Sequence, residues 1–174
     1  DWSSDVCSSD LDSDTNLSLR KRLVNRSADI LGDVLERWIN NKIEAKKQNP
    51  LYATYCWQKD ISKENAEIVW EKQIPEYIER MVRAFIPWPI AWCRLNNTGN
   101  ANVNGKVMKI FEAELVEIHN GFDAGTIFQH DGMLLFATRD PHICLMVKEL
   151  QIEGKNKMKE RDFLNGIGKS ITKI

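Results

Sequence analysis

Apolar residues recur at spacings of three and four along residues 20–43, and this pattern predicts an amphipathic helix. Its apolar stripe consists of Val24, Ala28, Leu31, Leu35 and Trp38. A stripe of this kind needs a partner surface, so we expect the helix to pack on another part of the protein. Residues 44–60 have no such period, and they read as a linker that lies along a surface through Leu51, Tyr52, Tyr55 and Trp57.

A second helix is expected over residues 73–85. Pro75 is tolerated in its first turn, and Pro87 prevents its continuation, because the residue before a proline leaves the helical region. The stretch RAFIPWPIAW (83–92) follows. We predict a rigid, buried corner in which Phe85 and Trp88 plug one end of the next domain, while Arg83 bonds to backbone carbonyls or stacks on Trp88. The corner residues are Arg83, Phe85, Pro87, Trp88 and Pro89.

From residue 90 onward the pattern changes to short alternating runs with turn signals between them. Asn104-Gly105 and His130-Asp131-Gly132 are such turns. We expect strands at 90–95, 106–117, 125–130, 133–138 and 142–151, and a last helix at 160–165. Five short strands separated by such turns predict an α+β, mostly β, fold built on a small five-stranded barrel.

Composition narrows the classes of function. The chain has 174 residues, 43% hydrophobic and 28% charged, with a net charge of −1, which is the balance of a globular protein. The four cysteines form no CxxC and the three histidines no HExxH, so we expect no metal site. No apolar run is long enough to span a membrane, and scattered cysteines fit reduced thiols in the cytoplasm.

The opening DWSSDVCSSDL fits no element that follows it. It resembles a translated sequencing-adapter scar, so residues 1–14 are left out of fold reasoning, and we expect the chain to begin where a contig was cut.

Positive charge gathers near the end of the chain. Residues 155–174 carry six cationic residues against two carboxylates, although the whole chain is slightly acidic. Lysines at such positions can replace the counterions of phosphates. The other reading is a solvated basic tail. Further candidate cations lie on the predicted strands, at Lys106, Lys109 and Lys148.

Several segments resemble the C-terminal part of the methionyl-tRNA formyltransferase family. They are KDISKENAEIVW (59–70), RAFIPWPIAW (83–92), KVMKIFEAEL (106–115), AGTIF (124–128) and LQIEGKNKM (150–158). The resemblance implies an OB-like barrel over 61–174, and it makes 20–43 a remnant helix of an upstream catalytic domain. The sequence departs from the family pattern at Ile86, Ile90, Arg139, Pro141, Glu153 and Lys159.

The resemblance also implies a function. The family transfers a formyl group from 10-formyltetrahydrofolate to methionyl-initiator tRNA, with an Asn, a His and an Asp in the upstream domain. We therefore expect no catalytic residue, no bound cofactor and no activity in this chain alone, and a monomer at full length. The expected partners are the missing domain and the backbone of initiator tRNA, contacted through Lys106, Lys109, Lys148, Lys155 and Lys157.

Two alternatives stay open at this point. The same domain could be a structural part of a nucleotide-sugar formyltransferase, although those enzymes generally lack the basic EGKNKM turn present here. It could also be a free-standing oligonucleotide-binding barrel, against which the apolar stripe of 20–43 argues.

Overall fold

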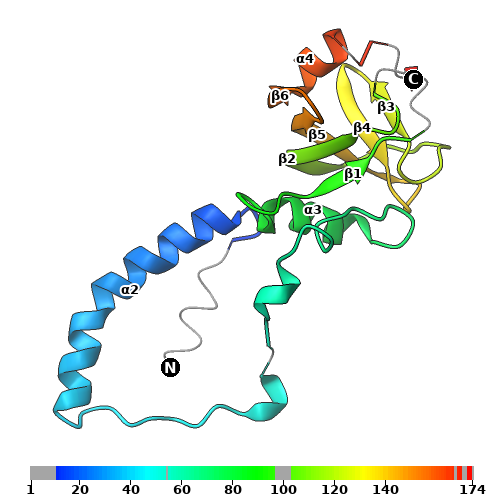
Figure 1. Ribbon diagram of the computed structural model, residues 1–174. Coiled ribbons are helices and arrows are strands. Elements are labelled where there is room, and N and C mark those ends of the chain that lie inside the picture. Colours follow the sequence, from blue (N-terminus) through cyan, green and yellow to red (C-terminus); the bar gives the residue numbers. More distant parts are fainter. Residues whose placement is uncertain (1–10, 54, 97–102, 167, 170–171, 174) are drawn as a thin grey trace. The chain divides into compact units, whose positions relative to one another are not determined.

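The structure is a computed structural model that describes residues 11–53, 55–96, 103–166, 168–169 and 172–173 (Figure 1). The chain divides into two units, Asp1–Asp60 and Ile61–Ile174. Residues 1–10 and most of the loop before Asn104 lie outside the described part. The proposed scar at the start of the chain therefore stays a prediction.

The first unit contains the predicted helix, which begins earlier than expected. Helix α2 spans Asn16–Ile39, and Thr15 is its N-cap. The side chain of Thr15 accepts a hydrogen bond from the backbone N–H of Ser18, while Ser18 Oγ accepts one from the backbone N–H of Thr15. Such a capping box satisfies two of the free donors at a helix start. The helix has no buried residue.

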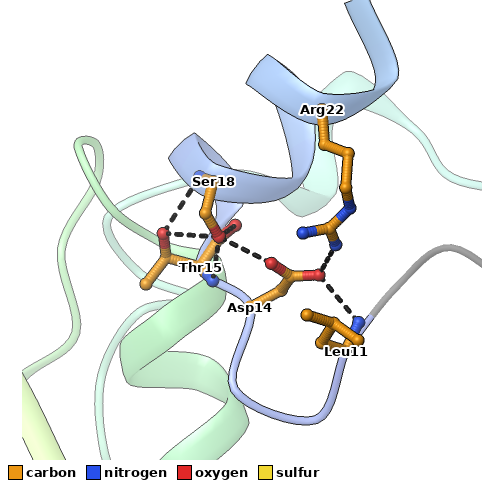
Figure 2. A network of polar contacts seen from close by, with 5 residues as sticks. All are labelled: Leu11, Asp14, Thr15, Ser18 and Arg22. Carbon is orange, nitrogen blue, oxygen red and sulfur yellow. Dashed lines mark hydrogen bonds and ion pairs between the residues drawn. The ribbon is translucent and has the colours of Figure 1, made fainter. Parts of the chain in front are cut away.

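An acidic side chain completes this helix start (Figure 2). Asp14 accepts hydrogen bonds from the backbone N–H of Leu11 and from Ser18 Oγ, each at 2.7 Å, and it forms an ion pair with Arg22. Arg22 lies two turns into α2, so one carboxylate links the incoming chain to the helix. The hydrogen bond from Arg22 is the main cause that lowers the pKa of Asp14 to about 2.

The linker contains two short 3₁₀ helices, η1 Pro50–Tyr52 and η2 Gln58–Asp60. Its apolar side chains are 60–86% exposed, and their packing along a surface stays a prediction. Tyr55 and Trp57 stack on each other, with 6.2 Å between ring centroids.

The second unit is a mostly antiparallel sheet. Its strand path runs β1-β2-β5-β4-β3-β7, and β6 pairs with β5. The strands are β1 Trp92–Arg94, β2 Val107–Glu117, β3 Ile127–His130, β4 Met133–Ala137, β5 Ile143–Ile152, β6 Met158–Lys159 and β7 Thr172–Lys173. All five predicted strands are present, which confirms a mixed, mostly β fold. Among the described residues the path is open, from β1 to β7, so closure into a five-stranded barrel is not confirmed.

Two helices accompany this sheet. Helix α3, Pro75–Ala84, buries Pro75, Ile78, Met81 and Val82, and α4, Glu160–Asn165, buries Phe163 and Leu164. Lys159 occupies the N-cap of α4 without a side-chain cap hydrogen bond, as the sequence predicts. Both helices add their apolar residues to one core with strand residues such as Met108, Ile110, Phe136 and Leu150.

The predicted corner is present, but its tryptophan is not core. Trp88 is 54% exposed, so the prediction that it plugs the domain is wrong. Ile86–Pro87 and Trp88–Pro89 are cis peptide bonds, and the backbone N–H of Ile90 donates to the carbonyl of Phe85 at 3.0 Å. This tight reversal turns Phe85 and Pro89 inward and leaves Trp88 outside. Arg83 forms a bidentate pair with Glu79, at 2.5 and 2.9 Å, which the sequence analysis did not foresee.

The aromatic residue in the core is Trp70, which sequence reasoning passed over. Its ring is 6% exposed and stacks on Phe136, with 4.7 Å between centroids. The loop that follows β2 passes directly over this indole. Gly125 adopts a φ of +86°, and an added Cβ there would lie 2.7 Å from Trp70 Cδ1. The loop therefore needs glycine at this position for both its backbone conformation and its close approach.

A candidate nucleic-acid interface

The candidate interface lies on strands β1, β2 and β5, on the side turned away from the core. Side chains alternate along β2, where Met108 and Ile110 are buried and Lys109 between them is exposed. In the register of the sheet, Lys109 lies opposite Trp92 on β1 and opposite Gln151 on β5. Lys109 therefore stands in the middle of a three-stranded surface.

Two further cations join Lys109 there. Arg94 lies opposite Val107, two residues from Lys109 on the same strand, so the two cations are diagonal neighbours. Gln151, opposite Lys109, donates from Nε2 to the carbonyl of Lys155 at 2.9 Å and holds the turn after β5 beside it. We call Arg94, Lys109 and Lys155 the open cluster. Within the described residues, no carboxylate oxygen lies within 4.0 Å of their side-chain nitrogens.

Further along the same strands the lysines are paired with glutamates. Lys148 forms an ion pair with Glu114, and Lys157 Nζ lies 2.5 Å from Glu149 Oε2. Lys159 Nζ lies 3.4 Å from Glu112 Oε2 and 3.5 Å from Glu149 Oε1. We call these three lysines and three glutamates the paired cluster. Its cations and anions are equal in number, so this region carries no net charge.

A break in the strand register creates the paired cluster. The pairing of β2 with β5 shifts between Ile110 and Glu112 and again between Glu112 and Ala113. Two residues of each strand lie between the regular pairs Ile110–Leu150 and Ala113–Val147, so neither strand has an extra residue overall. Lys157 Nζ lies over the Phe111 ring, 4.4 Å from the centroid. Glu112 and Glu149 are left directly opposite each other.

The titration of the paired cluster reflects this geometry. The hydrogen bond from Lys157 is the main cause that lowers the pKa of Glu149, and Lys159 adds to it. The hydrogen bond to Glu112 is the main cause that raises the pKa of Lys159. Both groups are therefore held in their charged forms.

The structure thus separates the five predicted tRNA-binding lysines. Lys109 and Lys155 belong to the open cluster, Lys148 and Lys157 to the paired cluster, and Lys106 is half-buried just before β2. Sequence reasoning missed Arg94, although its alternation with buried Cys93 on a predicted strand was a usable signal. It also missed the three glutamates, because the partners of Glu112 and Glu114 lie far away in the chain and Glu149 meets its lysines only through the pairing of β5 with β6.

The described part of the chain offers little else for chemistry. No three of its His, Cys, Asp and Glu residues are grouped so that they could hold a metal ion. Burial raises the pKa of Cys93 to about 12 and also raises that of Cys144, so neither thiol is a ready nucleophile. The rings of His119 and His142 lie 4.8 Å apart between centroids and are tilted by 32°. Over the same residues, no helix is long and apolar enough to cross a membrane.

Fold and surface together define a small, mostly β domain that carries the open cluster on one exposed face of its sheet. Residues 60–168 match the family model described as formyl transferase, C-terminal domain. The chain belongs to this family, as its motifs predict.

Relatives and solved structures agree with this assignment. The chain is 35% identical over 156 residues to the methionyl-tRNA formyltransferase of Legionella pneumophila strain Paris, which covers 88% of this chain and 45% of the relative. It is 32% identical over 157 residues to that of Halalkalibacterium halodurans, covering 89% and 45%. The chain thus spans less than half the length of these curated relatives. HypX from Aquifex aeolicus in complex with tetrahydrofolic acid shares the fold, with a TM-score of 0.55 at 17% identity over 84% of this chain and 24% of HypX.

Proposed function

We propose that this chain is the tRNA-binding C-terminal part of a methionyl-tRNA formyltransferase. The observation that carries the proposal is the open cluster, in which the exposed cations Arg94, Lys109 and Lys155 lie on neighbouring segments of the sheet although they are far apart in the chain. The names of the relatives supply the kind of nucleic acid.

The open cluster suits a phosphate backbone better than a base edge. Its cations stand on paired strands and on a turn held by Gln151, so little backbone freedom is lost on binding. Cations that replace condensed counterions give affinity without reading sequence. The paired lysines contribute less in this view, because each must first leave a glutamate. The open and the paired lysines, which were predicted together as tRNA contacts, therefore contribute unequally to the affinity for tRNA.

Formyl transfer itself belongs, in this proposal, to the part of the relatives that this chain does not cover. 10-Formyltetrahydrofolate binds there as well, and the chain alone is inactive. The exposed stripe of α2 then packs on that part. Labelled formyl donor, charged initiator tRNA and this chain should give no product above the buffer control. Turnover by the chain would contradict this division of labour.

The tRNA-binding role is tested with two matched double variants. Lys109→Ala with Lys155→Ala should weaken the binding of initiator tRNA and elongator tRNA by similar factors, and should flatten the plot of log affinity against log salt by roughly one to two units. Lys148→Ala with Lys157→Ala removes the same charge from the paired cluster and should change both quantities less. Equal affinity of the first variant and the unmodified chain would refute the proposed interface.

A further inference from the structure

Glu149 occupies a special position between the cations of the paired cluster. On β5 it lies opposite Lys159 of β6 on one side and opposite Glu112 of β2 on the other. Its two carboxylate oxygens contact different lysines, Oε2 with Lys157 and Oε1 with Lys159. One carboxylate therefore neutralises the two lysines that flank the end of the basic turn.

The two glutamates would repel each other without these lysines. Like charges directly opposite on neighbouring strands destabilise a sheet, and Glu112 and Glu149 are such a pair. Lys159 reaches both carboxylates, at 3.4 and 3.5 Å, and relieves that repulsion. A phosphate that drew Lys157 and Lys159 away would leave the two glutamates facing each other. Binding of phosphate at this end of the surface therefore carries a cost that the open cluster does not have.

We propose that Glu149 limits the phosphate-binding area of the interface, because its carboxylate competes with nucleic acid phosphates for Lys157 and Lys159 and confines phosphate binding to the open cluster. This inference rests on the proposed tRNA-binding function. Glu149, and not only the lysines, then influences how the domain binds tRNA. Of the two lysines in the EGKNKM turn, Lys155 belongs to the open cluster, whereas Glu149 neutralises Lys157 and also Lys159, which follows the turn.

The test is the substitution Glu149→Gln, which keeps the size of the side chain and removes its charge. Lys157 then becomes available and Lys159 keeps only Glu112 as a partner, so initiator tRNA should bind about three- to ten-fold more tightly at low salt. The salt plot should become steeper by roughly one to two units, since up to two more phosphates are neutralised. The melting temperature should stay within about 5 °C of the unmodified chain, because the lost ion pairs are partly exposed and the repulsion with Glu112 also disappears.

Glu117→Gln is the matched control, since Glu117 lies exposed on the neighbouring strand β2 and forms no ion pair with any described residue. It removes the same charge and should leave the salt plot unchanged. Adding Lys157→Gln and Lys159→Gln to Glu149→Gln should abolish the gain in affinity. A gain that survives in this triple variant, or a salt plot that Glu149→Gln does not change, overturns the inference.

The tRNA-binding function and the role of Glu149 can be refuted separately. If the unmodified chain binds no tRNA in a salt-dependent manner, the proposed function is wrong and the role of Glu149 falls with it. If the unmodified chain binds tRNA and the Glu149→Gln variant binds it equally well, the proposed function stands and only the role of Glu149 is refuted.

Discussion

Helices α2 and α3 have the same apolar periodicity and opposite environments. Helix α2 has 24 residues and buries none of them, whereas α3 has 10 residues and buries four. The first depends on its capping box and local ion pairs, and the second depends on packing in the core. Periodicity therefore predicts a helix, but it does not say whether the surface that the stripe requires belongs to the same unit.

The sharpest way to test this comparison is to truncate one apolar residue in each helix. Ile78 on α3 is fully buried, so Ile78→Ala should lower the free energy of unfolding by about 2–5 kcal/mol. Leu31 on α2 is 55% exposed, and Leu31→Ala should change it by less than about 0.5 kcal/mol. Urea unfolding followed by far-UV circular dichroism, which reports on both helices, measures both. Similar losses for the two variants would show that α2 is packed as firmly as α3.

A second pair of substitutions examines the core that α3 joins. Gly125→Ala combines an unfavourable φ with a Cβ too close to the Trp70 ring, so it should cost about 2–4 kcal/mol. Gly105→Ala has a similar φ of +78° and no atom within 4 Å, so it should cost only about 1–2 kcal/mol. Thermal unfolding of both variants separates close packing from backbone conformation. Equal costs would mean that the contact with Trp70 is unimportant.

The capping box should matter more for α2 than any apolar residue of that helix. Thr15→Ala removes the acceptor for the backbone N–H of Ser18 and should cost the helix about 1 kcal/mol. Because α2 has no buried residue to hold it, this loss should appear as faster amide exchange in its first turns. Amides of α3 in the same sample should keep their protection. Unchanged exchange in α2 would mean that other contacts anchor it.

The smallest effect concerns pH at the start of α2. Asp14 has its pKa lowered from 3.8 to about 2, so its contribution to the helix is fully present above pH 3.8 and is lost as the pH falls through about 2. Carboxyl chemical shifts followed by NMR measure this pKa directly. Arg22→Ala should move the pKa of Asp14 back toward 3.8, and an unchanged value would exclude Arg22 as the cause.

Much of the fold followed from the sequence, and the failures have physical reasons. The five strands and the last helix were predicted because alternation and turn residues are local signals. Strands β6 and β7 have two residues each, which is too short for any period. Trp88 was misplaced because an apolar neighbourhood in sequence does not fix the direction of a side chain in a tight reversal.

The lysines of the candidate site could be predicted from the sequence, but the glutamates that lie beside them could not. A basic turn can be read from residues 155–159, but Glu112 lies more than forty positions before the Lys159 that it meets. The shift in register that brings them together has no sequence signature. Long-range pairing therefore decided which cations are open and which are neutralised.

The segment beside β1 has a consequence for how this domain meets partners. The backbone N–H of Ile68 donates to the carbonyl of Trp92 at 2.8 Å, and the backbone N–H of Trp92 donates to the carbonyl of Ala66 at 3.0 Å. These bonds use the outward backbone groups of Trp92 in the three-residue strand β1, which would otherwise offer a template for another chain. Recognition by adding a strand at this edge is thereby blocked at Trp92. A partner that approaches from this side meets side chains instead of free backbone, which suits a polyanion better than an extended peptide.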